Sequence, residues 1–218
     1  MKIVTFACDF YADIAPAYQY LLHKNWPLCP FEVIYVTNSK KLNVDAKVHY
    51  IKDKPDIMFG WRLRQFIKNH YSDDLLLFMM IDYLIKDVNH DLVTRAHKLC
   101  MQPKTGHVRL RHMPRPESNH PEPGFGNIDK RKSYCLSLQP GIWKTDLLYR
   151  LCNDRENPWG TEVRGSRRVK AMTDLDFITT DTAAIIHHNY YRKRRAFGVG
   201  FVRDNVPERF WPDALKGE

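Results

Sequence analysis

The sequence predicts an α/β fold in which helices cover both faces of a mostly parallel sheet. Short apolar segments of strand length alternate with segments of helical spacing along most of the 218 residues. One segment, 74–83, is apolar without interruption until it reaches the carboxylate of Asp82. Such a run is too short to cross a membrane and is typical of a strand buried on both faces of a parallel sheet.

The first part of the chain has the clearest periodicity. Strands are predicted at 2–7, 31–37 and 48–51, and helices at 13–24 and 57–69. In the second helix, apolar side chains at helical spacing should face the sheet, which turns Arg62 outward or toward a ligand. These apolar positions are Phe59, Leu63, Phe66 and Ile67.

The later elements are less regular. Asn89 is expected to cap a helix that ends at Cys100. The stretch 112–133, with four prolines and two glycines, predicts a long surface loop. Further strands are predicted at 134–138 and 183–187 and a helix at 143–152, followed by a basic segment from residue 190.

Composition limits the class of protein. We expect a single domain over residues 1–218, since hydrophobic residues make up 44% and charged residues 27% of the chain. No apolar stretch is long enough for a membrane span, and the opening lacks the features of a signal peptide, so a cytoplasmic location is expected. The five scattered cysteines lack a CxxC pair and are expected to be reduced. No P-loop or GxGxxG motif occurs.

Three clusters suggest chemistry. Asp82 ends a buried strand, where a carboxylate can hold a divalent ion against a diphosphate or can simply terminate the strand. The sequence Gln139-Pro140-Gly141 predicts a turn between a strand and a helix start, or a plain connection. Asn157 and Pro158 are typical of a helix N-terminus, which places Glu162 about one turn into that helix.

Taken in order, these clusters resemble small bacterial and phage glycosyltransferases with the GT-A nucleotide-diphospho-sugar fold. The resemblance covers roughly residues 1–170. The matching segments are Cys8-Asp9, Trp26-Pro27, Cys29-Pro30, Gly60-Trp61-Arg62-Leu63, Asp82-Tyr83, Leu138-Gln139-Pro140-Gly141-Ile142-Trp143 and Pro158-Trp159-Gly160-Thr161-Glu162.

The resemblance implies a set of site residues. Glu162 would be the general base of an inverting sugar transfer, and Asp82 would bind Mn²⁺ or Mg²⁺. The second acid of the family's metal-binding pair is replaced by Ile81, so the metal site is weaker, completed by His187 or its rival His188, or absent. The residues expected to bind the donor, a UDP-sugar, are Asp9, Asn38, Arg62, Asp82 and Gln139.

The acceptor is predicted from charge. A net charge of +9 attracts polyanions, and basic residues follow Glu162 closely in the sequence. We therefore predict a hydroxymethylated base in DNA, as in phage DNA glycosylation, slightly ahead of a cell-surface glycan. The expected acceptor-binding residues are Trp159, Arg164, Arg167 and Arg168. The rival from another class is a nucleic-acid-binding module that has lost catalysis.

Overall fold

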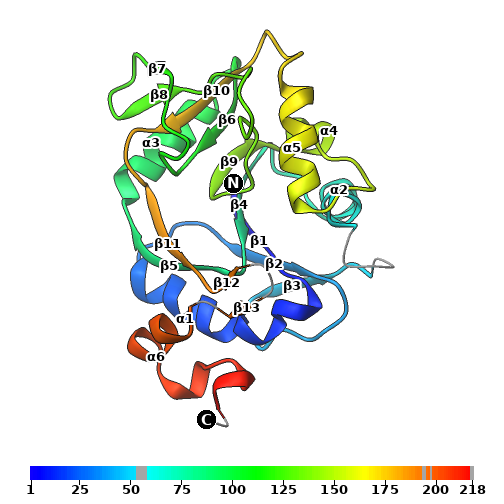
Figure 1. Ribbon diagram of the computed structural model, residues 1–218, viewed down its shortest axis with the longest axis vertical. Coiled ribbons are helices and arrows are strands. Elements are labelled where there is room, and N and C mark those ends of the chain that lie inside the picture. The colour runs from blue at the N-terminus through cyan, green and yellow to red at the C-terminus, as the bar shows by residue number, and fades with distance from the viewer. Residues whose placement is uncertain (53–57, 193–194, 197, 217–218) are drawn as a thin grey trace.

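A nine-stranded sheet forms the centre of the molecule (Figure 1). The computed structural model describes residues 1–52, 58–192, 195–196 and 198–216. The strand order is β3-β2-β1-β4-β9-β6-β10-β8-β7. The strands are β1 (Lys2–Phe6), β2 (Val33–Thr37), β3 (Lys47–Tyr50), β4 (Leu75–Met80), β6 (Thr105–Arg109), β7 (Ser118–Asn119), β8 (Phe125–Asn127), β9 (Gly141–Lys144) and β10 (Asp176–Thr180).

Most of these strands run in one direction. Strand β1 is parallel to β2 and β4, β2 is parallel to β3, and β6 is parallel to β10. Strand β9 is inserted antiparallel between β4 and β6, so β6 has the same direction as β4. The carboxyl ends of β1, β2, β4 and β6 therefore lie at one edge of the sheet. The predicted α/β class with a mostly parallel sheet is confirmed.

Strand β4 shows why the apolar run forms a central strand. It pairs with β1 on one side and β9 on the other, and Leu76, Leu77 and Phe78 are fully buried. Side chains of a strand alternate between the faces of a sheet, so a strand covered on both faces has to be apolar at every position.

Helices cover both faces of the sheet, as the alternation of elements predicts. On one face lie α1 (Ala15–Asn25) and α3 (His90–Cys100), and on the other lie α2 (Phe59–His70), α4 (Thr145–Leu151) and α5 (Pro158–Val169) (Figure 1). The Asn89 side chain accepts a hydrogen bond from the backbone N–H of Leu92, which confirms the predicted cap of α3. The four apolar residues predicted to bury one face of α2 are all in the core.

A smaller sheet lies beside the large one. It consists of β5 (Tyr83–Val88), which follows Asp82 directly, and β11 (Ile185–Asn189), which overlaps the strand predicted at 183–187 and begins two residues later. The remaining elements are β12 (Tyr191–Arg192), β13 (Arg195–Ala196), α6 (Val199–Asn205) and the 3₁₀ helices η1 (Asp9–Ile14), η2 (Glu208–Phe210) and η3 (Asp213–Leu215). Of the basic segment from residue 190, Lys193 and Arg194 lie outside the described residues, as does Ile57 at the predicted start of α2.

The prediction of a strand at 134–138 is wrong. Tyr134 has a φ of 60°, which is incompatible with extended backbone. The N–H groups of Leu136 and Leu138 donate to the side chains of Ser166 and Glu162 on α5, at 3.1 and 2.8 Å, in place of a neighbouring strand. This segment is thus attached to a helix by side-chain acceptors, an arrangement that has no signal in sequence periodicity.

The segment 139–141 also differs from expectation. Gly141 begins strand β9 rather than a helix, and the helix predicted at 143–152 starts later, as α4. A Cβ atom at residue 141 would lie 2.6 Å from Cε1 of His107, so glycine is required by close packing between β9 and β6. The predicted loop at 112–133 contains the short strands β7 and β8.

Candidate active site

A pocket of about 290 Å³ opens at the carboxyl edge of the sheet, where β1 and β4 end beside α2 and α5. This is the position where ligands bind in open α/β sheets. Four predicted site residues line it: Arg62 and Asp82, expected to bind the donor, Glu162, expected to be the base, and Trp159, expected to bind the acceptor. The other lining residues are Phe6, Ala7, Cys8, Phe10, Tyr11, Phe59, Met80, Tyr83, Leu138, Asn157 and Pro158.

Asp82 forms one wall of the pocket, between β4 and β5. Its backbone is fixed, because its carbonyl oxygen accepts a hydrogen bond from the N–H of Tyr190 at 2.8 Å. Its Oδ1 atom is buried and receives no hydrogen bond from any described residue. Burial raises the pKa of this carboxyl to about 7. A buried acceptor without a donor is available to a ligand hydroxyl or a cation.

Glu162 reaches the pocket from α5. Its Oε1 accepts hydrogen bonds from Oγ of Ser137 at 3.1 Å and from the N–H of Leu138 at 2.8 Å. Burial raises the pKa of Glu162, although these two bonds and the charge of Arg109 act in the opposite direction. The side chain is held in one orientation, and its pKa is displaced toward neutrality, which are the properties needed in a general base.

Helix α5 begins as the sequence predicts. The side chain of Asn157 accepts a hydrogen bond from the N–H of Gly160 at 2.7 Å, and Pro158 occupies the first turn. This cap fixes the start of a helix that contributes Pro158, Trp159 and Glu162 to the pocket lining. The Trp159 side chain is 61% exposed, so a large aromatic surface is open to solvent at the pocket.

The predicted donor residues Asp9 and Asn38 lie behind the pocket rather than in its lining. The Asp9 carboxylate accepts hydrogen bonds from the backbone N–H groups of Ser39 and Lys40, both at 2.8 Å, and thereby fixes the loop after β2. Asn38 is buried and accepts a hydrogen bond from Nη1 of Arg62. These contacts orient the guanidinium of Arg62, which does line the pocket.

Gln139 is close to the site in sequence but does not line the pocket. Its neighbour Leu138 does, and the Oε1 of Gln139 is buried without a donor among the described residues. Gln139, which was predicted to bind the donor, therefore lies outside the pocket lining.

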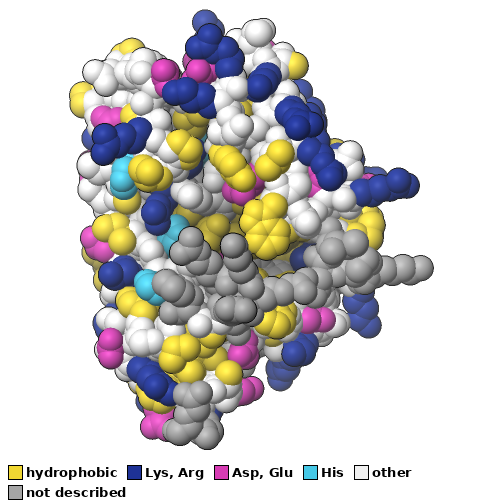
Figure 2. Space-filling model, viewed as in Figure 1, with side chains coloured by type: hydrophobic (Ala, Val, Ile, Leu, Met, Phe, Trp, Pro, Cys, Tyr) yellow, Lys and Arg dark blue, Asp and Glu magenta, His cyan; other side chains and the backbone are white. Residues whose placement is uncertain are grey.

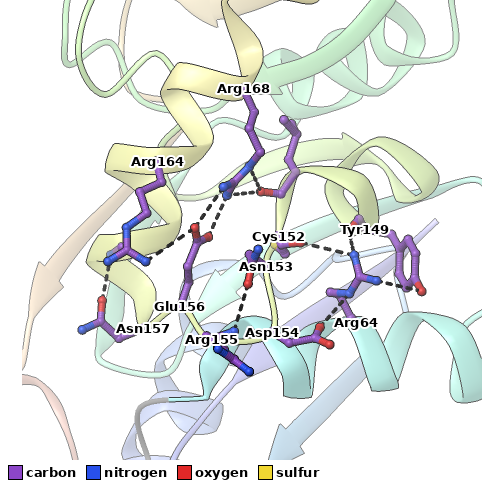
Figure 3. Close-up of polar contacts among 12 residues, drawn as sticks. Arg64, Tyr149, Cys152, Asn153, Asp154, Arg155, Glu156, Asn157, Arg164 and Arg168 are labelled. Carbon is purple, nitrogen blue, oxygen red and sulfur yellow. Dashed lines mark hydrogen bonds and ion pairs between the residues drawn. The ribbon is translucent and has the colours of Figure 1, made fainter.

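None of the three arginines predicted to bind the acceptor is among the residues that line the pocket. Arg168 donates to both oxygens of Glu156, at 2.9 and 2.7 Å, and to the carbonyl of Leu151 (Figure 3). Arg164 lies 4.0 Å from the same carboxylate. Arg167 and Arg164 are exposed, and basic side chains gather over α5 on the face shown in Figure 2.

His187 is the predicted second metal ligand, on β11. One face of its ring stacks on Tyr83, with centroids 4.3 Å apart, and Nη1 of Arg111 lies 3.3 Å from Nδ1 and 3.4 Å from Nε2. Burial and the charge of Arg111 lower the pKa of His187 to about 3, so the ring is neutral. Its rival His188 stacks on Phe201, with centroids 5.1 Å apart.

These contacts decide how well a divalent ion fits. Asp82 offers an oxygen without a donor among the described residues, whereas Nη1 of Arg111 lies within 3.4 Å of both ring nitrogens of His187, and the charge of this guanidinium repels a cation. In the described ranges no group of three His, Cys, Asp or Glu side chains is placed to hold a metal. The residues therefore do not fit an ion held jointly by Asp82 and His187.

Sequence reasoning missed three residues of this region, Tyr83, Arg109 and Arg111. Tyr83 lines the pocket next to Asp82, and Arg109 is buried with its charge near Glu162. Alternating arginines at the end of an apolar segment, Val108-Arg109-Leu110-Arg111, were a signal that could have found the two arginines. A charge at alternate positions places both side chains on one side of a strand end.

Several solved structures with a similar fold are glycosyltransferases. No family model matches this chain, and no curated protein matches it. The mannosyltransferase PcManGT from Pyrobaculum calidifontis, in complex with GDP-Man and Mn²⁺, aligns with 88% of this chain at a TM-score of 0.52 and 12% identity. The chain spans only 57% of that protein's length.

Two further structures have a similar fold. The galactosyltransferase LgtC, in complex with donor and acceptor sugar analogs, aligns over 96% of this chain and 99% of its own, at a TM-score of 0.50 and 11% identity. Glucosyl-3-phosphoglycerate synthase from Mycobacterium tuberculosis aligns over 88% of this chain and 72% of its own, at a TM-score of 0.52 and 15% identity. The chain has a GT-A-type fold.

Proposed function

We propose that this protein is a glycosyltransferase that moves a sugar from a nucleotide-diphosphate donor to a hydroxyl group. The observation that carries the proposal is the pocket at the carboxyl edge of the sheet, which brings together Asp82, Arg62 and Glu162. These residues are up to 100 positions apart along the chain: Arg62 lies on α2, Asp82 in the turn after β4 and Glu162 on α5. Both carboxyls have pKa values raised by burial, which is a property of groups at functional sites.

Each side chain has a role in this reaction. Glu162 accepts the proton of the acceptor hydroxyl while the hydroxyl oxygen attacks C1 of the sugar from the face opposite the leaving group. The C1–O bond to the diphosphate breaks, and the nucleoside diphosphate leaves with the electron pair. Arg62 can pair with phosphate oxygens, and Asp82 accepts a hydrogen bond from a donor hydroxyl. This sequence of events inverts the configuration at C1.

For the donor we propose a UDP-sugar. The sequence predicts Mn²⁺ or Mg²⁺ as the ion, and Asp82 is the one expected ligand that would offer it an oxygen. For the acceptor we propose a hydroxymethylated base in DNA, ahead of a cell-surface glycan. The net charge of +9 and the exposed arginines of α5 support a polyanionic acceptor. The exposed ring of Trp159 would stack on a base or a sugar ring beside the pocket.

Donor binding and transfer test the reaction. Isothermal titration with UDP-, GDP- and other nucleotide-sugars, with and without Mn²⁺, should identify a donor that binds the wild-type protein. Absence of binding to every donor would refute the glycosyltransferase and leave the nucleic-acid-binding module as the better explanation.

The acceptor is tested separately. The protein is incubated with a radiolabelled donor panel and with matched duplexes that carry either cytosine or hydroxymethylcytosine. Label should enter only the hydroxymethylated duplex. Label on neither duplex, from a donor that binds, would exclude DNA as acceptor without affecting the proposed reaction.

A further inference from the structure

We propose that the guanidinium of Arg111 takes the place that a divalent ion would occupy beside Asp82 and His187, so that the donor binds without metal. The inference rests on the proposed function, since it identifies the cation that faces the donor diphosphate in the same site. Three independent features support it: the position of Arg111 at the sheet edge, its contacts, and the charge balance of the region.

The position of Arg111 follows from the sheet. It comes directly after β6, which has the same direction as β4, so Arg111 and Asp82 both follow the carboxyl ends of strands at one edge. Its backbone is fixed there, because its carbonyl oxygen accepts hydrogen bonds from Oγ1 of Thr179 at 2.6 Å and Nε of Arg109 at 3.1 Å. A side chain on so rigid a base can be preorganised for a ligand.

The contacts of the side chain leave it capacity for a ligand. Nη1 lies against the ring nitrogens of His187, which in turn stacks on the pocket residue Tyr83. Nε is buried and has no acceptor in the part of the chain that the structure describes. No carboxylate of the described residues forms a hydrogen bond or ion pair with this guanidinium. A buried guanidinium donor without an acceptor favours an anion.

The charge balance points the same way. Tyr83, which lines the pocket next to Asp82, lies within electrostatic reach of Arg111, so the guanidinium is close to this part of the pocket. A second cation placed against this fixed charge would be repelled, the more strongly because the region is partly buried. Ile81 stands where the resembling enzymes often have a second acid, which removes one expected metal ligand. The same site thus lacks one metal ligand and has gained a permanent positive charge.

A guanidinium can take over the task of a metal ion in this reaction. The leaving nucleoside diphosphate gains negative charge as its bond to C1 breaks, and a cation next to it stabilises that charge. Arginine stays charged at every accessible pH and can donate two parallel hydrogen bonds to phosphate oxygens. In this arrangement His187 is a neutral support that holds Arg111 and Tyr83 in place.

Titration of nucleoside diphosphates tests the inference without relying on turnover. UDP and GDP are titrated calorimetrically into the wild type and into R111M, R111K, H187A and R115M, in EDTA and in Mn²⁺, and Mn²⁺ alone is titrated into each protein. Arg115, an exposed arginine four positions along the same segment, is the matched control. Circular dichroism and thermal melts establish that each variant is folded.

The wild type should bind one nucleoside diphosphate equally well in EDTA and in Mn²⁺. R111M should weaken that binding about tenfold or more, R111K should weaken it less because it keeps the charge, and R115M should not change it. Mn²⁺ alone should bind wild type and H187A alike.

Two results would overturn the inference alone: nucleotide binding that requires Mn²⁺ and is lost in H187A, or binding in EDTA that R111M leaves unchanged. Absence of nucleotide binding by the wild type in both buffers would refute the proposed function itself, and the inference with it.

Discussion

The two sides of helix α5 use charged residues in opposite ways. On the side facing the pocket, the Glu162 carboxylate receives its two hydrogen bonds at Oε1, and Asp82 across the pocket has an oxygen with no donor among the described residues. On the other side, the Glu156 carboxylate is 2% exposed and is bonded at both oxygens by Arg168 (Figure 3). One side leaves acceptors available, and the other saturates them.

The saturated side positions the pocket. Arg168 also donates to the carbonyl of Leu151 at the end of α4, and Arg64 of α2 pairs with Asp154 at 2.8 Å and stacks 4.1 Å from the ring of Tyr149. These contacts connect α2, α4 and the start of α5. They explain why Arg168, which the sequence suggests for acceptor binding, instead connects α4 to the start of α5: a fully paired charge stabilises the fold, whereas an unpaired one is available to a ligand.

The largest expected effect comes from removing the proposed base on the pocket side. The substitution E162Q should lower kcat about 100-fold or more, because an amide cannot accept the acceptor proton. Donor affinity should change little, since glutamine can still accept from Ser137 and Leu138. Steady-state kinetics and donor titration measure the two quantities, with the exposed Glu208 changed to Gln as control. Undiminished turnover would remove Glu162 from the mechanism.

A substitution on the saturated side should act on stability instead. E156Q leaves Arg168 without its ionic partner in a partly buried position and should lower the free energy of unfolding by about 2–4 kcal/mol. Urea unfolding measures this change. The control is E117Q, which breaks the exposed pair of Glu117 with Lys132 and should cost less than about 1 kcal/mol. Equal effects of the two substitutions would contradict the contrast between the sides of α5.

Asp82 should make stability depend on pH. Its folded pKa, about 7, exceeds the ordinary value of 3.8, so the folded state binds more protons than the unfolded state between these values. Stability should therefore fall as pH rises from about 4 to about 7. In EDTA, D82N should remove this fall and be more stable than the wild type by roughly 1–3 kcal/mol at pH 8. Unfolding curves at pH 4 and pH 8 compare the two proteins. A fall of equal size in D82N would assign the effect to other groups.

The smallest effect concerns the cap of α5. N157A removes the acceptor of the Gly160 N–H and should cost about 1 kcal/mol of stability. Urea unfolding measures it, with the exposed Asn43 changed to Ala as control. Because the cap lies at the pocket, donor titration of the same variant shows whether the helix start also sets the geometry of the site. A stability equal to that of the control would mean that solvent replaces the cap.

Among the described residues, no helix combines the length and apolar character required to span a membrane.

The fold class and most elements of the first 100 residues, η1 and β5 excepted, were predictable from the sequence, because apolar periodicity and capping residues such as Asn89 act locally. The cap at Asn157 and the position of Glu162 on α5 follow from the same local chemistry. The strand Leu75–Met80 and the carboxylate after it could be recognised because burial on both faces requires an uninterrupted apolar run.

Tertiary structure decided the rest. The segment 134–138 has the apolar content of a strand, but its N–H groups are satisfied by side chains of α5, and β9 enters between β4 and β6 from a position that the sequence suggests for a turn. Arg111 meets His187 across 76 positions of the chain. Periodicity reports which side of an element is buried, whereas the partner of a charge depends on which distant segments the sheet brings to one edge.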